Sequence, residues 1–209
     1  MNRNWNCPKK KQARLDTIVT QFRTHFGPCV VNQYWSMAGL CDKPGCELDQ
    51  LVSTGLVTER QFHGVEIIKD IYQRNVTAYP NAHWYNDDFF RAMSKAKNDG
   101  IYFPDIVNAD LIQTCVTGAS LINNIFGLMN SGMLVANFIM SHRQYDLSYT
   151  AEDVLDALNE GPRFRWAMRN GWQFEDRYYE YAGTGKQSAT TMGTFVFFKP
   201  HAQVQRMAA

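Results

Sequence analysis

Long apolar runs are missing from this sequence, and so is an export signal. No window approaches about 18 uninterrupted apolar residues, the length that a membrane-spanning helix needs. The most apolar stretch, GMLVANFIM at 132–140, has the length of a buried strand. The first segment, MNRNWNCPKKK, is polar and lacks the apolar core of a signal peptide. We therefore expect no membrane association and a cytoplasmic location.

Cysteine is scarce, and its spacing is not that of a disulfide framework or a zinc ribbon. The chain has 5 cysteines, at Cys7, Cys29, Cys41, Cys46 and Cys115. Their number is odd and no CxxC pair occurs, which argues against both kinds of framework. Cys41 and Cys46 lie in one loop and could form half a metal site, but no second half is evident. We expect no metal, and buried or loop thiols in a reducing compartment.

The signatures of hydrolases are missing as well. No G-x-S-x-G elbow is present for a serine nucleophile, and the 5 histidines are scattered along the chain. The segment AGTGKQSAT at 182–190 lacks the GxxxxGK[ST] spacing of a phosphate-binding loop and lies between two predicted strands. We interpret it as a mobile hairpin loop.

The sequence has no large excess of positive or negative charge. The net charge is +1, so the chain as a whole is not predicted to bind polyanions. Two local runs are basic, and they form either solvated surface or contacts to nucleic-acid phosphates. They are Lys9, Lys10, Lys11 and Arg14 near the start of the chain, and Arg163, Arg165 and Arg169 in its last third.

The sequence does contain enough apolar material for one core. Of the 209 residues, 45% are hydrophobic and 13% are aromatic, which suits a single α/β domain of this size. No internal repeat, low-complexity tract or shift in composition marks a boundary. We expect one domain over residues 1–209, with residues 1–10 flexible.

Segments with helix and strand patterns alternate along the chain. Helical spacing or helix-end signals occur in 12–26, 46–57, 68–79, 87–100, 114–130 and 150–159. Short apolar segments at 29–35, 62–67, 82–86, 106–107 and 132–140 predict strands, and two aromatic segments at 172–183 and 190–199 predict an antiparallel pair. The chain is therefore predicted to be an α/β protein with a doubly wound, mostly parallel sheet and a C-terminal antiparallel strand pair.

Polar residues mark the ends of three predicted strands. Glu66 closes the second strand, and in such a sheet ligands bind outside the carboxyl ends of the strands. A carboxylate there can accept hydrogen bonds from both hydroxyls of a ribose; the alternative is a loop cap or a pair with Lys69. Asp87 and Asp88 follow the third strand, although an aspartate is also ordinary at a helix N-cap.

Asn108 and Asp110 lie just past the fourth strand and are predicted to face the same cleft. The alternative is that Asn108 and Asp110 belong to a polar turn that binds no ligand. Three polar strand ends in order indicate a nucleotide-type site more strongly than any one of them.

This order of elements, with GVE, NDD and IVNADL at the strand ends, resembles the class I S-adenosylmethionine-dependent methyltransferases. The chain is similar to a divergent member of that family from about Val30 to Lys199, through element order and short acidic segments rather than long motifs. The resemblance implies a Rossmann-like methyltransferase fold and S-adenosylmethionine as the cofactor.

The resemblance also implies roles for the strand-end residues. The acid after the second strand binds the cofactor's ribose, the acid after the third contacts adenine, and residues after the fourth face the methyl acceptor. Carried over, the cofactor-binding residues are Glu66, its neighbour Ile67, Asp87 and Asp88, and the catalytic residues are Asn108 and Asp110.

The sequence departs from the family pattern in two places. The loop YWSMAGLCDKPGCE lacks the usual GxGxG turn, and we expect Ser36, Ala38 and Gly39 to approach the cofactor in its place. The segment NADL has Asn108, but it has neither the prolines nor the aromatic residue of the [DNS]PP[YFW] tetrapeptide. That absence weighs against an ordinary DNA-base methylase.

The predicted function is S-adenosylmethionine-dependent methyl transfer to an acceptor that the sequence leaves open. Nucleic acid is a candidate through the two basic runs, while the short chain favours a small acceptor or help from a partner subunit. The alternatives are a catalytically degenerate nucleoside- or partner-binding module of the same fold, and an enzyme that degrades S-adenosylmethionine. A dinucleotide oxidoreductase would also need Glu66, but its G-x-G-x-x-G turn is missing. The oligomeric state is not indicated.

Overall fold

A computed structural model describes residues 15–28, 31–41, 44–102, 104–111, 113–142, 147–181 and 190–200. Their contacts divide into two compact units. One comprises the described residues up to Asn108 together with Pro200, and the other runs from Ala109 to Lys199. A single domain over residues 1–209 stays a prediction, and the expected flexibility of residues 1–10 lies outside the described ranges.

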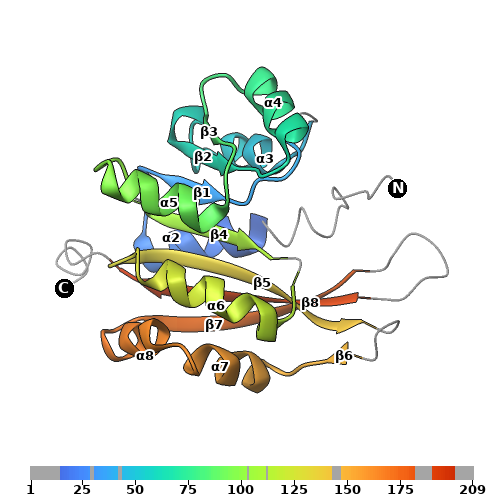
Figure 1. Cartoon of the computed structure of the whole chain (residues 1–209), viewed down its shortest axis with the longest axis vertical. Coiled ribbons are helices and arrows are strands. Elements are labelled where there is room, and N and C mark those ends of the chain that lie inside the picture. Colours follow the sequence, from blue (N-terminus) through green and yellow to red (C-terminus); the bar gives the residue numbers. More distant parts are fainter. Residues whose placement is uncertain are drawn as a thin grey trace. The chain divides into compact units, whose positions relative to one another are not determined.

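The first unit alternates helices with short parallel strands (Figure 1). Its strands are β1 (Tyr34–Ser36), β2 (Phe62–Val65), β3 (His83–Tyr85) and β4 (Ile106–Asp110), the last of which continues into the second unit. Its helices are α2 (Gln21–Phe26), α3 (Glu47–Ser53), α4 (Lys69–Ala78) and α5 (Phe89–Asn98), with a π-helical turn at Leu15–Thr20 and a 3-10 turn at Glu59–Gln61.

The strands of this unit are ordered β3-β2-β1-β4 and pair in parallel. The strand order reverses at β1, which lies between β2 and β4. Because parallel crossovers are right-handed, a reversal of this kind places the connecting helices on opposite faces of the sheet. It also makes the carboxyl end of β1 the topological switch point, where ligands bind in doubly wound sheets.

Aromatic side chains fill both faces of these short strands. On one face the rings of Tyr34 and Phe62 stack with centroids 5.6 Å apart. On the other face Trp35 stacks on His63 at 4.6 Å, and His63 stacks on His83 at 4.5 Å. This alternation buries β1 and β2, which are only three and four residues long, and holds their register.

The second unit is built on antiparallel strands with helices packed together on them. Its elements are α6 (Cys115–Phe126), β5 (Gly132–His142), β6 (Leu147–Ser148), α7 (Ala151–Asn159), α8 (Pro162–Arg169), β7 (Gln173–Tyr181) and β8 (Thr190–Lys199). The strand order continues from β4 through β5 and β8 to β7, with β6 paired to β5. Helix α6 contacts β5 and packs against α7 and α8 (Figure 1).

A cluster of aromatic side chains forms the centre of this unit. The ring of Phe126 meets Phe164, Trp172 and Phe197 edge to face, with centroids 5.5, 5.2 and 5.4 Å apart. These rings come from α6, α8, the residue that precedes β7, and β8, so one contact group joins the helices to the antiparallel pair.

The architecture confirms the predicted α/β fold with a doubly wound, mostly parallel sheet and a C-terminal antiparallel pair. Several boundaries differ. Residues 162–169 form helix α8, which the sequence analysis treated only as a basic run; Pro162 at its first turn supplies a favourable start. Strand β1 includes Ser36, which was expected in the following loop. Of the predicted hairpin loop 182–190, residues 182–189 lie outside the described residues and Thr190 begins β8.

Among the described helices, none combines the length and the apolar character needed to cross a membrane.

Candidate functional site

The carboxyl ends of the first unit's strands meet in one row. Ser36 at the end of β1 is paired in register with Gly64 on β2 and with Asn108 on β4. On the next pair, Val65 of β2 lies opposite Tyr85 of β3. The residues that follow β1, β2 and β3 therefore emerge at the same edge of the sheet. Asn108 and Asp110 were expected just past the fourth strand, but both lie within β4, because that strand is longer than its apolar run Ile106–Val107.

Glu66 leaves β2 in a turn whose backbone is held on both sides. Its N–H donates to the Tyr85 carbonyl at 3.0 Å, and the side-chain amide of Asn86 donates to the carbonyls of Glu66 and Ile67 at 2.8 and 3.1 Å. Glu66 Oε1 accepts the Ile68 N–H at 2.8 Å. One carboxylate oxygen thus caps the turn, and no partner is recorded for Oε2 among the described residues.

Ile67 projects from this turn into solvent. Its side chain is 71% exposed, and that of Ile68 is 54% exposed. Two neighbouring aliphatic side chains left in water beside a carboxylate are costly unless a ligand or partner covers them.

The two aspartates after β3 have different roles. Asp88 is the N-cap of α5 and accepts the Arg91 N–H at 3.1 Å. Asp87 is half-buried, accepts the Asp88 N–H at 2.8 Å, and forms an ion pair with Arg91 at 3.3 Å. The helix-cap alternative is thus present at Asp88; assignment of either carboxylate to adenine stays a prediction.

A buried carboxylate that the sequence analysis missed lies behind this edge. Glu47, the first residue of α3, is 3% exposed and accepts hydrogen bonds from three side chains. The donors are the Tyr34 hydroxyl, the Ser36 hydroxyl at 3.0 Å to both oxygens, and the Asn108 amide at 2.7 Å. Ser36 and Asn108 were both expected at the ligand; here their donors are directed to Glu47.

The same network leaves one buried acceptor open. Asn108 is 1% exposed, and its Oδ1 has no hydrogen-bond partner in the described structure. Because a carboxylate can only accept, the bond to Glu47 fixes the amide with its nitrogen toward Glu47. Oδ1 must then point elsewhere, and a buried acceptor of this kind normally has a partner.

The loop after β1 is fastened by a residue of α4. Asn75 is fully buried; its Nδ2 donates to the Gly39 carbonyl at 2.7 Å and its Oδ1 accepts the Cys41 N–H at 2.8 Å. Gly39 has a φ of +56°, a conformation that suits glycine. The Met37 N–H donates to the Asn108 carbonyl at 3.2 Å. Ala38 and Gly39 are half-buried, so the loop without a GxGxG turn is nonetheless held in a defined course.

Asp110 has its own partners in the second unit. Asn137 Nδ2 lies 3.4 Å from Asp110 Oδ1, and the Thr194 hydroxyl donates to Asn137 Oδ1 at 2.5 Å. Since a hydroxyl donates to Oδ1, the Asn137 amide nitrogen faces Asp110. The carboxylate is thereby oriented through strands β5 and β8.

Two of the three arginines in the later basic run serve the fold. Arg163 Nη1 donates to Asn124 Oδ1 at 3.2 Å, and Arg165 Nη1 donates to the carbonyls of Asn159 and Glu160 at 2.7 and 3.3 Å. Arg165 therefore satisfies carbonyls at the end of α7. Lys9, Lys10, Lys11 and Arg14 lie outside the described residues.

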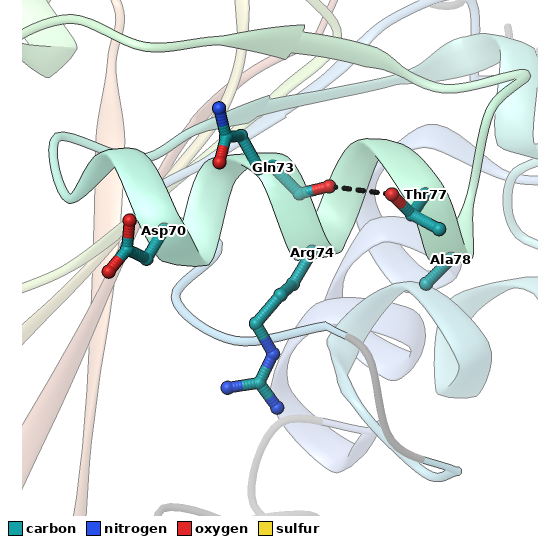
Figure 2. A pocket seen from close by; sticks show the side chains of 5 residues that line it. All are labelled: Asp70, Gln73, Arg74, Thr77 and Ala78. Carbon is teal, nitrogen blue, oxygen red and sulfur yellow. Dashed lines mark hydrogen bonds between the residues drawn. The ribbon is translucent and has the colours of Figure 1, made fainter.

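Figure 2 shows a surface hollow of about 480 Å³ on the exposed side of α4. Its described lining comes from one helix and consists of Asp70, Gln73, Arg74, Thr77 and Ala78. The Thr77 hydroxyl donates to the Gln73 carbonyl at 2.9 Å, and the labelled polar side chains point in different directions rather than toward a common centre. None of the residues predicted to bind cofactor lines it.

Within the described part of the chain, no group of three or more His, Cys, Asp or Glu side chains is arranged to hold a metal ion.

No protein-family model and no curated protein sequence matches the chain. Several solved structures are similar to it. The precorrin-6y C5,15-methyltransferase from Geobacter metallireducens GS-15 is 11% identical, with 95% of this chain and 92% of that chain covered and a TM-score of 0.54.

Two ligand complexes are similar to the same extent. An O-methyltransferase from Bacillus cereus in complex with SAH is 7% identical over 93% of this chain and 82% of that one, with a TM-score of 0.53. TYW2 from M. jannaschii in complex with AdoMet is 10% identical over 94% and 79%, with a TM-score of 0.52. The chain therefore has the Rossmann-like fold of the class I S-adenosylmethionine-dependent methyltransferases, as the resemblance of its sequence implied.

Proposed function

We propose that the first unit binds S-adenosylmethionine at the carboxyl edge of its sheet and that the chain transfers the cofactor's methyl group to an acceptor. The observation that carries this proposal is the Glu66–Ile67 turn. It sets a half-buried carboxylate beside a 71% exposed isoleucine at the end of β2, in a backbone fixed by Asn86.

The residues at this edge fit such a cofactor. Glu66 Oε2 is an acceptor for ribose hydroxyls, and Ile67 offers an apolar surface to the face of a base. Asn108 Oδ1 is a buried acceptor that lacks a described partner, as expected of an atom that receives an N–H from a ligand. S-adenosylmethionine, when bound, supplies an electrophilic methyl group on a sulfonium sulfur.

The loop after β1 and the aspartates after β3 complete the proposed site. Gly39 and Ala38 present backbone without bulky side chains, and Asn75 keeps that backbone in place. Asp87 and Asp88 are both candidates to accept from an adenine amino group, since the hydrogen bonds and the ion pair that hold them use Oδ1 in each case.

On the acceptor side we propose Asp110 as the group that receives a proton. Methyl transfer to a hydroxyl or amine releases a proton, and a carboxylate oriented by Asn137 can accept it. Asp110→Asn should then lower turnover at least tenfold while S-adenosylmethionine affinity changes less than threefold. The reverse pattern would move Asp110 into cofactor binding.

The two main candidates for the methyl acceptor are a nucleic acid and a small molecule. A nucleic acid would contact Lys9, Lys10, Lys11 and the exposed Arg163, Arg165 and Arg169, although Arg163 and Arg165 each also donate within the fold through Nη1. Affinity for a nucleic acid held by phosphate contacts should fall steeply as salt rises. A salt-independent affinity would indicate a small molecule or a protein.

A second candidate, a binding module without methyl transfer, is favoured by one observation. The hydroxyl of Ser36 and the amide nitrogen of Asn108 both donate to Glu47 rather than toward the edge of the sheet. Such a module would bind S-adenosylmethionine and S-adenosylhomocysteine but release no S-adenosylhomocysteine in the presence of any acceptor.

The proposal is tested at Glu66. Glu66→Gln should weaken S-adenosylmethionine binding about 5- to 150-fold. This corresponds to about 1–3 kcal/mol, the cost of leaving a hydrogen-bonding group without its partner. The matched control is Glu152→Gln, which makes the same chemical change at an exposed position on α7 of the second unit. Unchanged affinity in a folded Glu66→Gln protein would remove Glu66 from the site.

A further inference from the structure

The outward face of helix α8 carries an exposed tryptophan among arginines. Trp166 is 50% exposed, and Phe164 and Ala167 are the buried residues of the helix. Arg163 lies three positions before Trp166 and Arg169 three positions after it, and side chains at this spacing are neighbours on one side of a helix. The indole therefore lies between two arginines on the side of α8 that is turned away from the core.

The arginines of this helix keep donors that the fold does not use. Arg163 Nη1 donates to Asn124 Oδ1, and Arg165 Nη1 donates to carbonyls at the end of α7. A guanidinium carries five N–H groups, and no partner is recorded for Nε or Nη2 of either side chain among the described residues. For the side chain of Arg169 the described structure records neither a hydrogen bond nor an ion pair. All three side chains are exposed, so each has N–H groups available to a ligand.

The positive charge of this face is not paired with acids in the part of the chain that the structure describes. The segment GPRFRWAMRNGWQF at 161–174 contains no aspartate or glutamate. The neighbouring helix α7, which contacts α8 (Figure 1), carries two acids in its first turn, whereas Arg165 binds carbonyls at its other end. Its other acids, Asp156 and the C-cap residue Glu160, form no recorded ion pair with an arginine of α8.

An exposed indole surrounded by cations suits a polyanion that has flat apolar faces. An interface with another protein normally has an apolar core inside a polar rim, but Trp166 is the only large apolar side chain exposed on α8, all of which the structure describes. Phosphates pair with guanidinium groups, and any nucleic-acid base can stack on an indole. A duplex presents its phosphates but keeps its base faces stacked inside. Only a single strand therefore uses both the arginines and the indole.

We propose that the α8 face, formed by Arg163, Arg165, Trp166 and Arg169, binds single-stranded nucleic acid. A base stacks on the Trp166 indole, and the phosphates next to that base pair with the arginines. The face lies entirely within the second unit, and none of its residues is assigned to the cofactor. That the bound nucleic acid is also the methyl acceptor rests on the proposed function, whereas the binding itself needs no cofactor.

The experiment is fluorescence anisotropy of labelled oligonucleotides of about 15 nucleotides, a length that single-strand-binding surfaces cover. The full chain is titrated, without S-adenosylmethionine, into one mixed sequence prepared as single-stranded RNA, as single-stranded DNA and as a duplex. We expect the better bound single strand to have about tenfold higher affinity than the duplex, and this affinity to fall as salt rises. Equal affinity for single strand and duplex, or no binding of either single strand, would overturn the proposal.

Two variants separate stacking from charge. Trp166→Ala should weaken binding of the single strand about 5- to 150-fold, the effect of losing one stacked base, and should leave the salt dependence unchanged because no charge is removed. Arg169→Gln should weaken binding and also reduce the slope of log affinity against log salt by about 0.7, the value for one phosphate contact to a single strand. The matched control is Arg60→Gln, which removes an exposed arginine from the first unit and should change neither quantity.

The variants also distinguish the α8 face from Lys9, Lys10 and Lys11. If the single strand binds but Trp166→Ala and Arg169→Gln both behave like Arg60→Gln, the strand is held elsewhere and the proposal is refuted. Circular dichroism shows whether the variants are folded, and Arg169→Gln decides the proposal if Trp166→Ala is not.

The outcomes for the cofactor and for the strand are independent. A chain that binds the single strand but not S-adenosylmethionine would refute the proposed function and leave the α8 face in place. A chain that binds S-adenosylmethionine but no single strand would refute the α8 face alone.

Discussion

Glu47 combines a buried charge with three donor side chains, and it fixes how Ser36 and Asn108 are used. The Tyr34 hydroxyl, the Ser36 hydroxyl and the Asn108 amide all point to this carboxylate. It joins the ends of β1 and β4 to the start of α3. The hydrogen bonds of the site are thus set partly by a residue that no ligand needs to touch.

We predict that Glu47→Gln destabilises the protein by about 1–3 kcal/mol. Glutamine can keep its oxygen toward Tyr34 and Asn108 and donate from its amide nitrogen to the Ser36 hydroxyl. The loss then comes from replacing a charged acceptor by a neutral one, because hydrogen bonds to charged groups are the stronger ones. Urea unfolding measures the change, and Glu152→Gln on the exposed face of α7 serves as the control. Equal stability of wild type and Glu47→Gln would mean that the buried network contributes nothing.

His63 makes stability depend on pH. Burial, and to a smaller extent the charge of His83, lowers the pKa of His63 from 6.5 to about 3. Between these values the unfolded chain binds a proton that the folded chain does not, so the contribution to stability is complete above pH 6.5 and is lost as the pH falls. By pH 5 the loss is about 2 kcal/mol.

The check is urea unfolding between pH 7 and 5 for the wild type and for His63→Phe, which keeps a ring between Trp35 and His83. The slope of stability against pH should flatten in the variant. The two slopes are compared rather than the absolute stabilities, because phenylalanine also loses the 3.1 Å contact of His63 Nδ1 with the Tyr85 hydroxyl. Parallel slopes would contradict the assignment.

Among the elements, strand β2 depends on Gly64, against which the ring of Trp84 on the neighbouring strand β3 packs. A Cβ on Gly64 would lie 2.2 Å from Trp84 Cζ3. Trp84 cannot easily turn away, since its Nε1 donates to the Tyr79 carbonyl at 3.0 Å. The pairing of β2 with β3 therefore requires the bare backbone at this position.

We predict that Gly64→Ala costs about 1–3 kcal/mol through overpacking. Combining it with Trp84→Leu should recover part of that loss, because the smaller side chain makes room for the methyl group. Thermal or urea unfolding of the four proteins gives the coupling directly. If the free-energy changes of Gly64→Ala and Trp84→Leu simply added in the double variant, the Trp84 ring would not be the obstacle.

The elements also show what the sequence could and could not predict. Helical spacing and short apolar runs were sufficient for the order of elements along the chain and for the doubly wound fold class, and Glu66 was located at the end of β2 because the strand pattern stops there. Glu47 gave no signal, since an acid in the first turn of a helix is ordinary. Asn75 and Asn86 act through side-chain bonds to distant backbone, which leave no periodic trace. Helix α8 was missed because its arginines masked a short amphipathic pattern.

At the scale of the whole molecule, composition predicted a single domain, whereas the contacts of the described residues divide into two compact units that share β4. We predict one cooperative unfolding transition, because a continuous strand cannot leave one unit without disturbing the other. Hydrogen exchange in urea should give peptides from β2 and from α6 the same midpoint, and Glu47→Gln should lower both. Two separate midpoints would show that the units fold independently.

The most direct test of the account is calorimetric titration of the purified chain with S-adenosylmethionine and S-adenosylhomocysteine, with NAD as the control. We expect micromolar binding of the first two at one site per chain and none of NAD. Failure of a folded sample to bind either would contradict it, and would mean that the fold retains Glu66 and its turn without the cofactor.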